Sequence, residues 1–115
     1  MRLVIIESPY AGDTARNVAY AKAAMRDCLE RGEAPYASHL LFTQAGILDD
    51  TNPAQRALGI EAGLAWGAKA DATVVYRDLG VTAGMQEGIS RALSEGRKVE
   101  YREIRAWAGR GSSQS

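Results

Sequence analysis

The segment from Gly80 to Ala92 holds the residues of this 115-residue chain that are best suited to chemistry. Gly80 and Gly84 follow an apolar run, and Glu87 comes three residues after Gly84. Glycine lets backbone N–H groups approach a ligand, and a helix N-terminus attracts anions. The helix dipole also favours an ionised carboxylate there, which is the state that a nucleophile in glycosyl transfer needs. Alternatively, Glu87 is a solvated residue that only complements the dipole.

A second candidate segment follows the apolar run Leu3 to Ile6. It offers a hydroxyl, an aromatic face and a turn, in the residues Ser8, Pro9, Tyr10 and Gly12. These groups could hold a ribose or a phosphate, although the pattern is neither a dinucleotide fingerprint nor a P-loop. The alternative is an ordinary strand-to-helix turn.

Further polar candidates lie in two other predicted loops. Asp78 could protonate a leaving group, and Asp49 and Asp50 are carboxylates at the expected rim. His39, at a predicted strand end, could donate to a ligand. Loop aspartates are often only turn formers, and His39 could equally be structural. A single histidine and a single cysteine, Cys28, form no zinc motif, so we expect no metal and no cofactor.

The composition indicates an ordinary soluble protein. Apolar residues make up 46% and charged residues 24%, and the formal net charge is zero. A dedicated binder of nucleic acid polymers would normally carry a basic excess, so this class is not expected. Cys28 is the only cysteine and falls on an apolar helical face, which indicates a core position and a reducing compartment. With neither a signal peptide nor a run of ~18 apolar residues, we expect a cytoplasmic protein without a membrane partner.

The elements that must position these residues alternate along the chain. Periodicity and turn residues predict strands at Leu3 to Ile6, Tyr36 to His39, Ala72 to Tyr76 and Val99 to Ile104, with helices between Asp13 and Gly32, Asn52 and Lys69, and Thr82 and Gly96. This order predicts an α/β fold with a small, mostly parallel sheet. Ligands bind such sheets at the carboxyl ends of the strands, where all the candidates above would lie. We expect one domain over residues 1–106 and a flexible tail over 107–115.

One predicted helix carries glycine at every fourth position, at Gly59, Gly63 and Gly67. This spacing places the three glycines along one face of the helix. Close packing of a neighbouring element, or of another subunit, is the favoured explanation over a ligand role.

Taken together, these motifs resemble the nucleoside 2-deoxyribosyltransferase-like superfamily. The resemblance covers Met1 to about Ile104. It is carried by Ser8-Pro9-Tyr10, an Asn17-bearing helix, Ala70-Asp71 before a strand, and Asp78-x-Gly80-x-x-x-Gly84-Met85-x-Glu87. The group includes deoxynucleoside-monophosphate N-glycosidases, and the chain is most similar to its small bacterial and phage members. The resemblance implies a Rossmann- or flavodoxin-like three-layer sandwich.

The resemblance also implies roles for particular residues. Glu87 matches the family's nucleophile, Ser8 and Tyr10 match groups that contact the sugar or phosphate, and Gly80, Gly84 and Met85 belong to the same ligand-facing motif. Gly63 stands where active members carry an aspartate, for which Glu61 and Asp78 are the remaining candidates.

Three functions stay open at this stage. The first is an enzyme, either a hydrolase that releases a base or a deoxyribosyltransferase. The second is a non-catalytic binder, such as a phage-encoded sponge for a nucleotide-derived signal. The third is an assembly protein without a ligand. For the first two, the partner is a nucleoside or nucleotide. The family resemblance also implies a homo-oligomer with sites shared between subunits.

Overall fold

The computed structural model describes residues 1–44, 46–49, 51–104 and 107. These residues form four strands and four helices, and only α2 and α3 follow one another without a strand between them. In order, these are β1 (Arg2–Glu7), α1 (Thr14–Glu30), β2 (Glu33–Tyr36), α2 (Ser38–Leu41), α3 (Pro53–Gly67), β3 (Ala72–Tyr76), α4 (Ala83–Ser94) and β4 (Lys98–Arg102). Side chains cap the three longer helices, because the Asp13, Asn52 and Thr82 side chains each accept a backbone N–H of the first turn.

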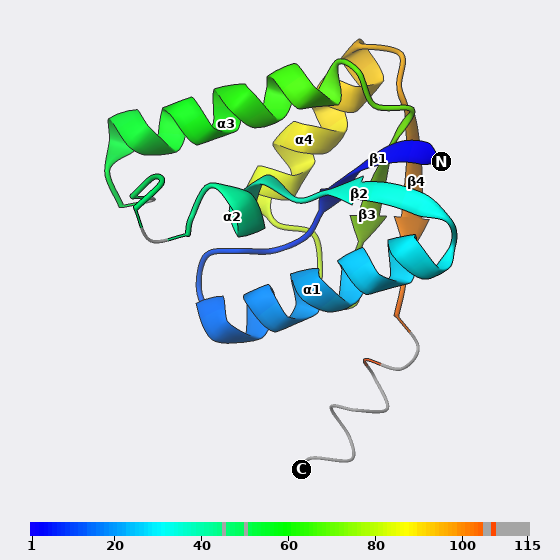
Figure 1. Ribbon diagram of the computed structural model, residues 1–115, viewed down its shortest axis with the longest axis horizontal. Coiled ribbons are helices and arrows are strands. Elements are labelled where there is room, and N and C mark those ends of the chain that lie inside the picture. The colour runs from blue at the N-terminus through cyan, green and yellow to red at the C-terminus, as the bar shows by residue number, and fades with distance from the viewer. Residues whose placement is uncertain (45, 50, 105–106, 108–115) are drawn as a thin grey trace.

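The four strands form one parallel sheet in the order β2-β1-β3-β4. In Figure 1, α1 lies below the sheet, and α3 and α4 lie above it. The prediction of an α/β fold with a parallel sheet is therefore confirmed. All carboxyl ends of the strands meet at one edge, which allows the candidate segments to form one shared site.

The face of the sheet under α1 is closed by the main core. Val4 and Ile6 of β1 and Val74 and Tyr76 of β3 point into it, together with Tyr20, Ala24 and Cys28 of α1. Cys28 is fully buried, as its position on the apolar helix face predicted. Since strand side chains alternate between faces, the residues between them, including Ile5, Glu7 and Thr73, face the opposite side.

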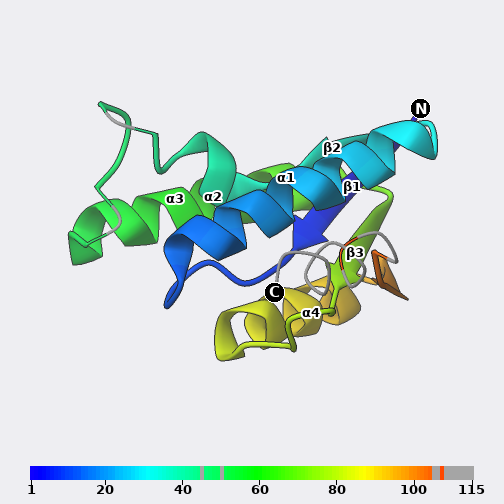
Figure 2. The same ribbon diagram turned by 90° about the horizontal axis from the view of Figure 1, so that it is seen from below.

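That opposite face is only partly covered. Helix α4 packs on β3 and β4 through Met85 and Ile89, which contact Val75 and Val99. Helix α3 packs mainly against α2 instead of the strands, and Gly67 is its only buried residue. Figure 2 shows α3 and α4 well apart at their N-terminal ends. The floor between them is β1, which α4 contacts on this side at the end of the strand.

The second strand differs from its prediction. It begins at Glu33 and ends at Tyr36, where a strand over Tyr36 to His39 was expected. Pro35 fits inside β2 because this is an edge strand, with a hydrogen-bonded neighbour on one side only. His39 lies in α2, a single helical turn. A short apolar run does not by itself distinguish a strand end from a helical turn, and packing against α3 decided it here.

The C-terminal end of the domain is fixed by two contacts. The Asp78 carboxylate accepts the backbone N–H of Ile104, and the Trp107 ring packs edge-on against Tyr20 at a centroid distance of 5.0 Å. Trp107 was assigned to the tail, and the rest of that predicted tail, residues 108–115, lies outside the described residues. No helix in the described part of the chain is long and apolar enough to cross a membrane.

Candidate active site

A cavity of about 890 Å³ opens between α3, α4 and the carboxyl end of β1. Ile5, Glu7 and Thr73 form its floor, and α2 with the β1–α1 loop closes one side. Small-molecule sites usually measure about 300–1,000 Å³, so this space suits a ligand of nucleotide size.

One wall of the cavity comes from the β1–α1 loop and α2. Ser8 Oγ and His39 Nε2 share a hydrogen bond of 3.1 Å, and the His39 ring lies 5.6 Å from that of Tyr10. Asn17 orients this loop, since its buried side-chain amide donates to the carbonyls of Tyr10 (2.9 Å) and Ala11 (3.0 Å). The structure thus brings His39 beside Ser8 and Tyr10, although His39 lies 31 positions after Ser8 in the chain. Their hydroxyl groups, ring faces and imidazole suit a sugar or a base edge.

The opposite wall is the first half of α4. Thr82 starts the helix, with its hydroxyl accepting the Met85 N–H at 3.2 Å. Gly84 and Glu87 line the cavity and are exposed, so a ligand can reach both. Met85 also borders the cavity but is 98% buried, and its main contact is with the sheet. Glu87 therefore presents an accessible carboxylate across the cavity from the Ser8–His39 wall.

The floor holds a second carboxylate, that of Glu7 at the end of β1. Burial raises the pKa of Glu7 to about 7, and the nearby positive charge of Arg97 opposes part of this rise. No hydrogen bond from the described residues reaches the carboxylate. It lies against the backbone of Gly88, where even a methyl group would overlap it. Glu7 is thus a half-buried cavity carboxyl group that is substantially protonated at neutral pH.

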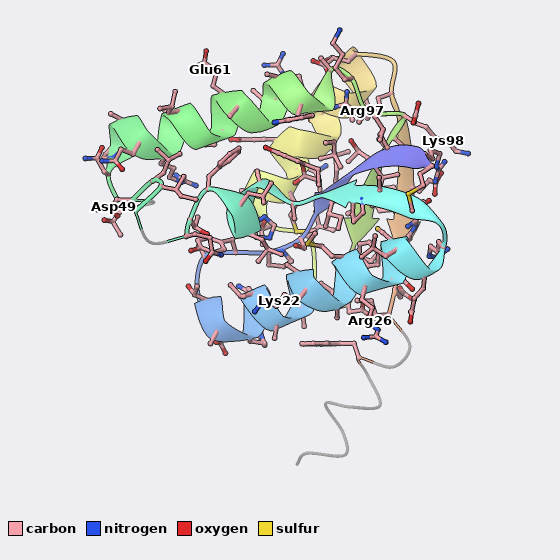
Figure 3. The ribbon with its side chains drawn as sticks, in the orientation of Figure 1. Lys22, Arg26, Asp49, Glu61, Arg97 and Lys98 are labelled. Carbon is pink, nitrogen blue, oxygen red and sulfur yellow. The ribbon has the colours of Figure 1, made fainter. Side chains whose placement is uncertain are left out.

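Arg97 is fixed behind this floor. Its guanidinium donates to Thr73 Oγ1 at 3.0 Å and to the Gly67 carbonyl at 2.6 Å, and it pairs with Glu95 at 2.7 Å. In Figure 3, Arg97 lies where the end of α3 approaches the start of β4. It holds these elements together and places a positive charge near Glu7.

Several predicted site residues do not border the cavity. Asp78 lies on the other face of the sheet, where it accepts the Tyr20 hydroxyl and the Ile104 N–H. Its carboxylate is already engaged in holding the fold, so we assign Asp78 a structural role. Pro9, Gly12 and Gly80 also stand outside the lining. Gly12 and Gly80 adopt φ of 97° and 93°, which explains glycine at both turns.

The remaining carboxylate candidates are also placed away from the cavity. Asp49 accepts the backbone N–H and hydroxyl of Thr51 at the periphery, and Figure 3 shows Glu61 pointing outward from α3. Asp50 lies outside the described residues. Within the part of the chain that the structure describes, no cluster of His, Cys, Asp and Glu is placed to hold a metal ion.

Four charged lining residues were not singled out as site candidates from the sequence. They are Glu7, Arg56, Arg91 and Arg97. A lone arginine on a helix carries no signal that separates a cavity wall from a solvated face. For Glu7, the signal was present, because strand alternation places it opposite the α1 core and at the strand's carboxyl end.

The glycine face of α3, formed by Gly59, Gly63 and Gly67, borders the cavity and also approaches neighbouring side chains. A Cβ atom at Gly59 would lie 3.2 Å from Leu48, one at Gly63 would lie 3.3 Å from Ser38, and one at Gly67 would lie 3.3 Å from Arg97. The predicted close approach is confirmed for these three positions. It lets α3 sit near α2 and Arg97 while leaving the cavity open. It also leaves Gly63 with no side chain to offer a ligand.

The architecture of this chain is shared with a solved enzyme structure. Among solved structures, the chain is similar to a 2-deoxyribosyltransferase from the psychrotolerant bacterium Bacillus psychrosaccharolyticus, described as a biocatalyst for the synthesis of antiviral and antitumoral nucleosides. The TM-score is 0.64 at 16% identity, over 88% of this chain and 72% of that one. At this identity the likeness shows a shared fold. No curated protein matches the chain.

The family is shown by a match that spans most of the sequence. Residues 2–102 match the model of a family described as Domain of unknown function (DUF7768), and the chain belongs to that family. The predicted relationship to deoxyribosyltransferases is thus supported as a distant one of fold.

Proposed function

We propose that the cavity binds a nucleoside or nucleotide and that Glu87 attacks its anomeric carbon, which makes the protein an N-glycosidase or a deoxyribosyltransferase. The observation that carries this proposal is the composition of one cavity. It places an accessible carboxylate, Glu87, across from the polar wall of Ser8, Tyr10 and His39. The fold shared with a 2-deoxyribosyltransferase supports the same substrate class. Catalysis by a carboxylate nucleophile needs no cofactor.

The binding mode follows from the two walls. A sugar at the carboxyl end of β1 would meet the hydroxyl of Ser8 and the ring of Tyr10, and the free N–H groups at the start of α4 would lie nearby. Arg56 and Arg91 line the cavity from α3 and α4 and would favour a phosphorylated ligand. Water then releases the sugar from Glu87 in a glycosidase, whereas a second base does so in a transferase.

A base-release assay tests this proposal. The protein is incubated with a panel of deoxynucleosides and their monophosphates, and free base is quantified by chromatography. We expect release by the wild type and its loss in Glu87→Ala. Glu30→Gln is the matched control, because it removes an exposed carboxylate on α1, on the far side of the sheet. Intact substrates after long incubation with concentrated wild-type protein would rule out the enzyme.

A non-catalytic binder is the second candidate. Gly63 offers no carboxylate at the position where active members of the deoxyribosyltransferase-like superfamily carry an aspartate. Asp78 is engaged in hydrogen bonds with Tyr20 and Ile104. A binder predicts that a nucleotide raises the melting temperature without turnover. Mass spectrometry of small molecules that co-purify with the protein would identify the ligand. The absence of any co-purified or stabilising nucleotide would contradict this function.

We also propose that a second copy of the chain packs on α3 and shields the open side of the cavity. Leu58, Ile60 and Trp66 of this helix are 56%, 49% and 59% exposed, and Ile60 also borders the cavity. Large exposed apolar side chains gathered on one helix are typical of an interaction surface. Light scattering should show an oligomer that Trp66→Glu dissociates. A monomeric wild type at high concentration would leave assembly without support.

A further inference from the structure

The Glu7 carboxyl group is not part of the hydrogen bonds and ion pairs that hold the described residues together. It ends β1 on the cavity face, and no described residue donates a hydrogen bond to it. By contrast, the buried carboxylate of Glu33 on the neighbouring strand is fully engaged with Arg2 and Arg102. A carboxyl group kept half-buried without a donor destabilises the folded state unless it is protonated. Its retention on the floor of a ligand-sized cavity therefore needs an explanation other than stability.

The chain also makes room for this carboxyl group. Gly88 follows Glu87 in the middle of α4, where glycine is about 1 kcal/mol less favourable than alanine. Its φ is in the ordinary helical range, so backbone conformation does not require glycine there. The space that a side chain at position 88 would fill is occupied by the Glu7 carboxylate. Gly88 and Glu7 are thus complementary, and this contact places Glu7 beside the helix turn that carries Glu87.

The proposed reaction needs a proton donor, and the acids that the sequence suggested for this role do not supply one. When the bond from the anomeric carbon to the base breaks, the base nitrogen receives the electron pair and must be protonated to leave easily. Asp78 is held on the far face of the sheet, and Gly63 has no side chain. Glu87 must be ionised to attack, so it cannot hold this proton.

We propose that Glu7 is the general acid and base of this cavity, acting beside the nucleophile Glu87. The inference rests on the proposed N-glycosidic function. Its geometric basis is the position of the Glu7 carboxyl group on the cavity floor, against Gly88 and without a donor. The pKa of Glu7, raised to about 7 by burial, fits this role, since an efficient acid titrates near the working pH. Two carboxyl groups in different environments then divide the nucleophilic and acidic work.

The proposed reaction takes place in two steps. In the first, the Glu87 carboxylate forms a bond to the anomeric carbon, the bond from that carbon to the base nitrogen breaks, and the Glu7 carboxyl group gives its proton to the base. In the second, the Glu7 carboxylate takes a proton from an attacking water. The water oxygen bonds to the anomeric carbon, and Glu87 leaves as a carboxylate. The products are a neutral base and a free sugar, and Glu7 ends protonated as it began.

Several other polar groups line the same cavity as Glu7. Those that carry or can gain a charge near neutral pH are His39 of α2, Arg56 of α3, Glu87 and Arg91 of α4, and Arg97 before β4. Arg97 lowers the pKa of Glu7, and desolvation raises it by more. A positive charge that stabilises the carboxylate after proton transfer assists the first step.

Leaving-group dependence tests the inference. Base release is measured for wild type, Glu7→Gln and the control Glu30→Gln, with natural deoxynucleosides and with a substrate whose base leaves readily without protonation. We expect Glu7→Gln to slow natural substrates by about 10²–10⁴-fold and the activated substrate far less. The limb of the wild-type pH–rate profile that falls above about pH 7 should disappear in Glu7→Gln.

A second variant moves the carboxyl group without changing its chemistry. Gly88→Ala introduces a methyl group where the Glu7 carboxylate lies, which displaces this flexible side chain. It should slow the natural substrates and shift the alkaline limb, whereas Ser90→Ala, at an exposed position of α4 outside this cavity, should do neither.

The outcomes separate the two proposals. If wild type releases base but Glu7→Gln keeps its full rate and its alkaline limb, the role of Glu7 is refuted and the proposed function stands. An equal loss of rate for natural and activated substrates would also refute acid catalysis by Glu7. If wild type releases no base from any substrate, the proposed reaction and this inference fall together.

Discussion

Replacing Glu7 by glutamine should make the protein more stable at alkaline pH. The side chain keeps its size, so the contact with Gly88 is preserved. The pKa of Glu7 is about 7 in the folded protein, against 4.5 for the unperturbed group. Above pH 7, the wild-type fold therefore bears the full free-energy penalty of a half-buried charge, which glutamine avoids.

The sign and size of the effect follow from linkage. Below about pH 4.5, Glu7 is protonated in the folded and unfolded chains, so its titration does not change stability there. Between pH 4.5 and 7, the folded chain keeps a proton that the unfolded chain has lost, so wild-type stability falls as pH rises. At about 1.4 kcal/mol per pKa unit, the full shift corresponds to roughly 3 kcal/mol. Because water in the open cavity screens the charge, the expected gain is smaller, at about 1–3 kcal/mol.

Urea unfolding at pH 4.5 and pH 8.5 measures this difference. For a domain of this size, a gain of about 2 kcal/mol moves the urea midpoint by on the order of 1 M. Glu30→Gln serves as the control for loss of a charge, because its exposed pair with Arg26 contributes little. If the advantage of Glu7→Gln over wild type were the same at both pH values, Glu7 would not be held protonated, and the reasoning would fail.

Two further predictions concern the rest of the fold. Ion pairs with Arg2 and Arg102 lower the pKa values of Glu33 and Glu100 to about 2. The stability that these pairs add is therefore complete above about pH 4.5 and is lost as the pH falls toward 2. Thermal melts between pH 6 and pH 2 should show this loss, and a melting temperature that does not change with pH would contradict it. Asp78→Asn should lower the free energy of unfolding by about 1–3 kcal/mol, because Tyr20 and Ile104 lose a charged hydrogen-bond acceptor. Turnover by the folded protein should not change. A loss of turnover with unchanged stability would instead indicate that Asp78 is a catalytic residue.

Much of the fold could be predicted because local patterns in the sequence specify its strands and helices. The run Ala72 to Tyr76 is buried throughout, as a continuous apolar strand in a parallel sheet should be. Asn52 before Pro53 and Thr82 before α4 start helices where their capping side chains predict. The second strand was misplaced, because a four-residue edge strand and a one-turn helix have no periodicity long enough to separate them.

The sequence by itself determined the alternation of strands and helices, and with it the sheet edge where Ser8, His39 and Glu87 converge. Only the tertiary structure decided which carboxyl groups other than Glu87 face the cavity. Asp78 accepts a hydrogen bond from Tyr20, which is 58 positions away, and Glu7 is desolvated by burial, in contact with Gly88. Such contacts between distant segments leave no local pattern, because burial and charge depend on what the completed fold brings beside a residue.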